Sequence, residues 1–213
     1  MVFNFDHLDN LPHGRYDDYH YDFRIALKHL VKWQMNYGNR CWPTLFFENH
    51  DNPRITSKAD KYFAFRDEIS KLCATVQFTF RGAPFIYQGQ EIAMANGDFK
   101  SVEDLRDVEA INMFVELVEK GKSPQEAFEK VMCGTRDHAR TPMQWDDSKN
   151  AGFTDGTPWI KVNKDSFVYN VKDQLTREDS PLNYYKKLIK LRKENKAFIY
   201  GTFELIKSNR IDC

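Results

Sequence analysis

The chain has 213 residues, which suits one ordinary globular domain. Its 31 basic and 31 acidic residues give a formal charge of zero, so the basic footprint of a nucleic-acid-binding protein is excluded. The mean hydropathy is −0.66, and no apolar run approaches the ~18 residues of a membrane helix. Aromatic residues make up 15% of the chain, which suits either a large core or a carbohydrate-binding cleft.

The N-terminus and the cysteines indicate a cytoplasmic location. Met1–Asp6 has neither the basic nor the apolar region of a signal peptide. The four cysteines lie far apart with no CxxC pair, which favours reduced thiols over a disulfide framework or a zinc site. We expect no metal and no cofactor.

Three short apolar runs predict buried strands at Met1–Phe5, Thr44–Phe47 and Pro84–Tyr87. Helical patterns lie between them, near residues 23–36, with Leu27, Leu30, Val31 and Met35 on one face, and along a stripe from Phe65 to Val76. Alternation of strand and helix predicts an α/β fold with parallel strands and right-handed crossovers.

The alternation of predicted strands and helices ends after residue 90. Apolar spacing predicts a helix over 108–118, and Ser123-Pro-Gln-Glu126 forms a capping box that opens a helix to about Met132. Residues 133–180 are expected to be irregular. Ser180-Pro181 then opens a last helix with Leu182, Tyr185, Leu188 and Ile189 on its apolar face, and Phe198–Ile206 is a candidate strand.

The most informative motif is Thr44-Leu-Phe-Phe-Glu-Asn-His-Asp-Asn-Pro-Arg54. An apolar strand delivers His50 and Asp51 at its carboxyl end, where a parallel α/β barrel collects reactive side chains. A carboxylate beside an imidazole can stabilise a cationic transition state or bind hydroxyl groups. The alternative is a strand-end turn in which Asp51 caps the following backbone.

A second motif, Arg136-Asp-His-Ala-Arg-Thr-Pro-Met-Gln-Trp-Asp146, places two arginines and a tryptophan in one loop. Arg136 can make a bidentate contact, and Trp145 offers a stacking face. The alternative is a surface loop with a local Arg–Asp pair.

Two further segments carry weaker signals. Gln88 to Glu91 follow the third strand, a position that suits a polar cleft rim, although Glu91 can equally begin a helix. The histidines and aspartates of residues 6–22 lack any known metal-ligand spacing, and we expect a solvated loop there.

Together these motifs resemble the α-amylase family. The matching segments are Phe47–Arg54, Gly82–Met94 and Arg136–Asp146, with Ala151-Gly-Phe-Thr and Pro158–Asn163 in support, and the similarity is greatest to the bacterial oligo-1,6-glucosidase and α-glucosidase branch. The resemblance covers nearly the whole chain. It implies that the three strands are the sixth, seventh and eighth of a TIM (β/α)8 barrel.

The resemblance also assigns roles to residues. Asp51 matches the family's third catalytic carboxylate, which stabilises the transition state. His50 matches a histidine that hydrogen-bonds the sugar, and Arg136 matches an arginine that holds the terminal glucose. The implied substrate is an α-glucosidic oligosaccharide, hydrolysed with retention of configuration.

The family's nucleophile and acid/base motifs are not found among the 31 acidic residues, so the resemblance implies a fragment that is inactive alone. We expect residues 1–196 to be the C-terminal part of the barrel, with a long insert at about 95–180. Residues 197–213 would begin a truncated β-sandwich domain. Two alternatives remain: a fragment of a trehalose-6-phosphate hydrolase, or a non-catalytic sugar-binding or assembly half that works beside the missing N-terminal half.

Overall fold

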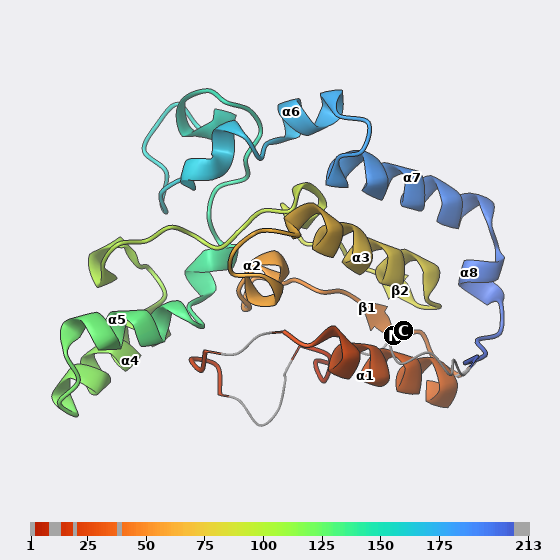
Figure 1. The fold of residues 1–213 in the computed structure, drawn as a ribbon, viewed down its shortest axis with the longest axis horizontal. Coiled ribbons are helices and arrows are strands. Elements are labelled where there is room, and N and C mark those ends of the chain that lie inside the picture. Colours follow the sequence, from red (N-terminus) through yellow and green to blue (C-terminus); the bar gives the residue numbers. More distant parts are fainter. Residues whose placement is uncertain (1–2, 9–13, 19–20, 38–39, 207–213) are drawn as a thin grey trace.

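The computed structural model describes residues 3–8, 14–18, 21–37 and 40–206. A small parallel sheet packs against helices, which are labelled in Figure 1. The helices are α1 (Phe23–Tyr37), α2 (Ile55–Ala59), α3 (Arg66–Thr79), α4 (Val108–Glu119), α5 (Pro124–Met132), α6 (Val171–Thr176), α7 (Pro181–Glu194) and α8 (Ala197–Tyr200). The strands are β1 (Thr44–Leu45) and β2 (Ala83–Pro84), and short 3-10 turns include η1 (Gln90–Ile92) and η3 (Arg136–Ala139).

The sheet is parallel, as predicted, but much shorter than expected. Thr44 pairs with Ala83, and Leu45 pairs with Pro84. Beyond this ladder the Phe85 carbonyl accepts the Gln77 side chain, and on the other edge of the β1 segment the Phe46 carbonyl accepts the His7 ring. The prediction of strands over Thr44–Phe47 and Pro84–Tyr87 was therefore too long.

Two other predicted strands are wrong. Residues 3–5 form no ladder; instead the Phe3 and Phe5 rings pack on Phe46 at centroid distances of 5.9 and 5.4 Å. Met1 and Val2 lie outside the described residues. In the Phe198–Ile206 segment, α8 closes a helical turn through the Gly201 amide and the Ala197 carbonyl, and residues 201–206 have no strand partner in the described structure.

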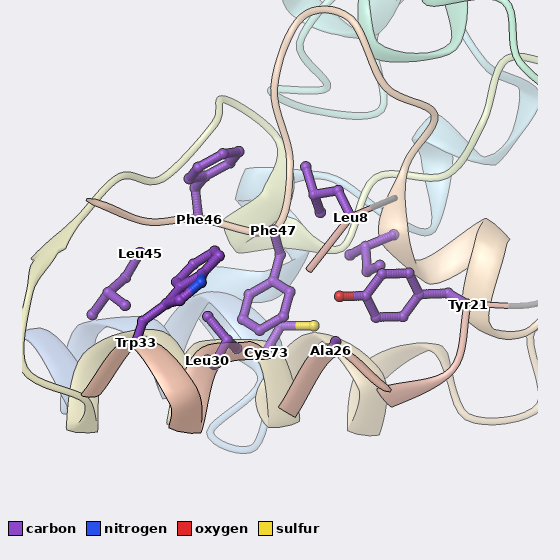
Figure 2. Close-up of a cluster of buried hydrophobic side chains, with 10 residues drawn as sticks. Leu8, Tyr21, Ala26, Leu30, Trp33, Leu45, Phe46, Phe47 and Cys73 are labelled. Carbon is purple, nitrogen blue, oxygen red and sulfur yellow. The ribbon is translucent and has the colours of Figure 1, made fainter. Parts of the chain in front are cut away.

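The core between the sheet and α1 and α3 follows the strand period of two. In Figure 2 Phe47 points toward Cys73 and Leu30, whereas Phe46 lies on the opposite side of its segment. His7 is buried in this region, edge-on to Trp33 at 5.1 Å, so the expectation of a solvated loop is wrong for His7.

The predicted helices are present, and the buried face of α1 differs from the predicted one. On α1 the buried residues are Ala26, Leu30, Trp33 and Gln34, whereas Leu27 and Met35 are exposed. The capping box of Ser123 and Glu126 is formed. On α7 Tyr185 and Leu188 are buried against α3, as the apolar spacing predicts. No described helix is both long and apolar enough to cross a membrane.

Candidate functional site

The segment that follows β1 is fixed by a buried ion pair. Arg54 Nη1 lies 2.8 Å from Glu48 Oε2, and both side chains are 1% exposed. The second Glu48 oxygen accepts the Ile55 amide at 2.9 Å, at the start of α2. The chain between Glu48 and Arg54 is thus held at both ends and presents His50 and Asp51 to the surface.

Asp51 is the centre of a group of charged side chains. Its Oδ1 lies 3.3 Å from Arg136 Nε and 3.2 Å from Arg140 Nη2, and its Oδ2 lies 3.3 Å from His50 Nε2. The Asp51 amide donates to Asn49 Oδ1 at 2.8 Å, which fixes the local turn. The carboxylate therefore lies between these three side chains and faces solvent, with 48% of its side chain exposed.

Arg136 begins η3 and Arg140 directly follows it, about 90 residues further along the chain than Asp51. The Thr135 side chain caps this turn by accepting the Asp137 amide. Arg140 Nε also donates to the His50 carbonyl at 3.0 Å, so this arginine contacts both residues of the His50-Asp51 pair. The geometry brings together all three predicted site residues, and it adds Arg140, which the sequence analysis did not single out.

Further charges lie behind Arg136. Its guanidinium forms ion pairs with Glu109 and, at 3.5 Å, with the buried Asp107. Arg15 contacts Glu109 at 3.3 Å and donates to the Asp51 carbonyl at 2.6 Å. The cluster thus contains three arginines and three acidic side chains and has no large net charge, which suits a neutral polyhydroxyl ligand. Its members are Arg15, Arg136, Arg140, Asp51, Asp107 and Glu109.

Buried aspartates fix the loop that carries the arginines. Asp137 Oδ2 accepts the amides of Arg106 and Asp107 at 2.6 and 2.9 Å. Asp107 Oδ2 in turn accepts the Arg136 amide at 2.8 Å. These reciprocal bonds join the start of α4 to η3, so the backbone that bears Arg136 is held from two sides.

An open cavity of about 240 Å³ adjoins Asp51. Its polar wall comprises Glu48, Asn49, His50 and Asp51, and its apolar wall comprises Phe3, Phe5, Phe46, Phe85, Ile86 and Tyr87. Aromatic rings beside hydrogen-bonding groups match the two kinds of surface that a sugar ring presents. Trp145, the predicted stacking residue, does not line this cavity.

The segment after β2 contributes less to the cavity rim than predicted. Gln88 is exposed, but Gln90 is 2% exposed, and its Nε2 donates to Gln77 Oε1 and the Tyr185 hydroxyl at 2.8 Å each. Gln90 therefore joins α3 to α7 instead of facing a ligand. Gly89 has φ +89°, and a Cβ there would meet the Met94 sulfur at 2.3 Å, so this turn needs glycine.

In the described part of the chain, no three His, Cys, Asp or Glu side chains are grouped to hold a metal ion. Glu48, which lines the cavity, is paired with Arg54, and Asp107 and Glu109, which lie beyond it, are paired with Arg136. The site as described can stabilise positive charge through Asp51 and donate hydrogen bonds through His50, Arg136 and Arg140.

Comparisons with known proteins agree with this arrangement. The sequence pattern of the family described as alpha amylase, catalytic domain, matches residues 1–201. An oligo-1,6-glucosidase of Parageobacillus thermoglucosidasius is 47% identical over 209 residues, or 97% of this chain. The trehalose-6-phosphate hydrolase of Escherichia coli is 40% identical over 98% of the chain.

Solved structures give the same result. The trehalose-6-phosphate hydrolase of Bacillus licheniformis matches 96% of this chain with a TM-score of 0.90 and 39% identity. The isomaltulose synthase of Erwinia rhapontici NX5 matches 88% with a TM-score of 0.80 and 40% identity. The chain spans 37% and 38% of the lengths of the two curated relatives, and 38% and 34% of the two structures.

Proposed function

Because the chain belongs to the alpha-amylase catalytic-domain family, we propose that it supplies part of the active site of an α-glucosidase. The reaction is hydrolysis of terminal α-1,6- or α-1,4-glucosidic bonds in short oligosaccharides, with retention. The observation that carries this proposal is the Asp51 carboxylate, held between two arginines and His50 at the mouth of a cavity with an aromatic wall.

In this proposal Asp51 stabilises the transition state. The sugar becomes oxocarbenium-like and gains positive charge, which a fixed anion stabilises more than it stabilises the neutral substrate. His50 and Arg136 donate hydrogen bonds to the hydroxyl groups of the terminal glucose and so orient it. Their placement at Asp51 supports this division of roles.

We also propose how the chain divides. Residues 1–196 form the C-terminal part of a TIM (β/α)8 barrel, with β1 and β2 as its seventh and eighth strands and an insert at about 95–180. A separate C-terminal domain begins near residue 197. The parallel pairing of β1 with β2, with α3 as the crossover, supports this division.

The purified chain is expected to be inactive by itself. Retaining hydrolysis needs a nucleophile and an acid/base carboxyl roughly 5–5.5 Å apart. The sequence motifs that carry them in the family are not found in these 213 residues. The missing N-terminal half of the barrel is thus the partner in this proposal, and a non-catalytic sugar-binding or assembly role is the alternative.

A chimera tests the proposal. The matched 37% of the Parageobacillus thermoglucosidasius oligo-1,6-glucosidase is replaced by this chain, and glucose release from isomaltose and maltose is measured. Activity in the chimera, with none in the isolated chain, supports the proposal. A folded chimera without activity on either sugar would contradict it.

The similarity to two trehalose-6-phosphate hydrolases favours a second candidate substrate. The same chimera is therefore assayed with trehalose-6-phosphate. A preference for the phosphorylated disaccharide over isomaltose would favour that activity. The near balance of charges around Asp51 leads us to expect the plain sugar.

A further inference from the structure

Arg54 is a buried arginine whose hydrogen bonds connect segments that are distant in the sequence. Its side chain is 1% exposed, and it meets acceptors from three separate segments. Nη1 donates to Glu48 Oε2 at 2.8 Å and to the Gln88 carbonyl at 2.9 Å, and Nη2 donates to the Ala139 carbonyl at 3.4 Å. One guanidinium therefore joins the ends of β1 and β2 to η3.

Each of these contacts lies close to a proposed site residue. Glu48 is three residues before Asp51, and Ala139 is adjacent to Arg140. The Ala139 carbonyl also accepts the Tyr87 hydroxyl at 3.0 Å, and the Arg54 guanidinium lies 5.1 Å from the Tyr87 ring. Burial raises the pKa of Tyr87, so the phenol remains a hydrogen-bond donor.

We propose that Arg54, together with Glu48, is a positioning residue: it sets the distance between Asp51 and the loop that carries Arg136 and Arg140. The inference rests on the proposed function only for its catalytic consequence. Arg54 itself is buried and does not line the cavity beside Asp51. It acts through the two segments that it holds together.

The expected effect of loosening this contact is large. The ion-pair distances from Asp51 to Arg136 and Arg140 are 3.3 and 3.2 Å, so a small shift of η3 would break both. Misplacement of a reacting group by about 1 Å can lower a rate by about 10²-fold. Lysine at position 54 keeps a positive charge for Glu48 but cannot reach all three acceptors at once.

A matched control exists on α7. Arg192 is also buried and donates to three carbonyl groups, those of Phe78, Phe80 and Gly82, at 2.6, 2.8 and 2.6 Å. It contacts none of the segments that carry site residues. Arg192→Lys therefore also removes a buried guanidinium, but it leaves the hydrogen bonds of Arg54 to Glu48, Gln88 and Ala139 in place.

The first experiment uses the full chain and needs no catalysis. Hydrogen exchange of the Arg140 Hε proton is followed by NMR, because that proton is bound to the His50 carbonyl. Arg54→Lys should accelerate the exchange about tenfold or more, as expected for the loss of about one hydrogen bond, whereas Arg192→Lys should change it less than about twofold. Circular dichroism establishes that both variants are folded.

If Arg54→Lys does not fold, Glu48→Gln decides the question, since it keeps the side-chain shape but removes the charge and one of the two acceptor oxygens. It should accelerate the Arg140 exchange by about threefold or more, because a neutral acceptor binds the guanidinium more weakly. Unchanged exchange in a folded Arg54→Lys chain, or in Glu48→Gln when the first is unfolded, would overturn the inference.

The second experiment measures kcat and KM in the chimera. Arg54→Lys should lower kcat by about 10–100-fold and raise KM by a smaller factor, because Arg136 remains available to bind the sugar but is no longer aligned with Asp51, and the transition state depends most on that alignment. Arg192→Lys should change neither by more than about twofold. Equal kcat values for the two variants would contradict the catalytic consequence. An inactive parent chimera would instead refute the proposed function and leave the exchange result valid.

Discussion

A buried arginine lies at each end of the small sheet, but the two arginines have different partners. At the carboxyl end Arg54 pairs with the buried Glu48 carboxylate, and at the amino end Arg192 meets only backbone carbonyl groups. Burial without a carboxylate lowers the pKa of Arg192. The buried carboxylate–arginine pair thus lies at the end of the sheet where the proposed chemistry occurs, whereas the arginine at the opposite end binds only neutral carbonyl groups.

The largest expected difference between the two ends is catalytic. In an active chimera Asp51→Asn should lower kcat by about 10³-fold, because it removes the anion that stabilises the transition state. Asp147→Asn, which removes an exposed carboxylate 2.8 Å from Lys172 on the insert, is the matched control and should leave kcat unchanged. A similar loss in both variants would show that Asp51 has no special role.

Stability provides the second comparison. Arg54→Met should lower the free energy of unfolding by about 3–5 kcal/mol, because Glu48 would remain buried without its cation. Arg192→Met leaves carbonyl groups unsatisfied and should cost about 1–3 kcal/mol. Urea unfolding at pH 7 measures both values, and equal costs would remove the proposed distinction.

The third comparison concerns pH. His7, which binds the Phe46 carbonyl beyond β1, and His138 in η3 are both buried, and burial lowers the pKa of each to about 4 from 6.5. The unfolded chain therefore takes up protons first, so their contribution to stability is complete above pH 6.5 and is lost as the pH falls toward 4.

Between pH 6.5 and pH 5 each of these histidines should lower the free energy of unfolding by about 2 kcal/mol. The measurement is urea unfolding of the parent chain and of His138→Gln at several pH values. The variant should lose roughly half of the pH dependence in this interval. An identical pH dependence in the two proteins would refute the assignment to His138.

The smallest expected effect is at the surface of α7, near Arg192. Glu194 lies 3.8 Å from Lys190, and both side chains are largely exposed. Glu194→Gln should change the free energy of unfolding by less than about 0.5 kcal/mol, because water screens exposed ion pairs. A cost similar to that of Arg54→Met would mean that burial does not explain the effect of the Glu48–Arg54 pair.

Local signals in the sequence predicted the helices well. The Ser123 capping box and the proline at the start of α7 depend on neighbouring residues alone, and both are formed. The strands were predicted less well, because a ladder needs a partner distant in sequence. Phe3 and Phe5 have strand-like composition, yet their segment packs its rings on Phe46 and makes no ladder.

The candidate site shows the same limit. The resemblance pointed to His50, Asp51 and Arg136, and the structure places them together. Arg140 was missed although it stands in the same motif, one turn after Arg136. Asp107 and Glu109 were missed because only the packing of α4 against η3 reveals their proximity. Asp107 caps the start of α4, but no local pattern indicates its contact with Arg136.

Two of the three acceptors held by Arg54 are main-chain oxygens, those of Gln88 and Ala139. Every amino acid supplies such an oxygen, so these contacts do not depend on which side chains stand at positions 88 and 139. Among the residues whose groups contact the Arg54 guanidinium through these three hydrogen bonds, only Arg54 and Glu48 therefore depend on their side chains. A variant library of this region should tolerate broad substitution at 88, and at 139 where space permits, while rejecting nearly every change at the two charged positions.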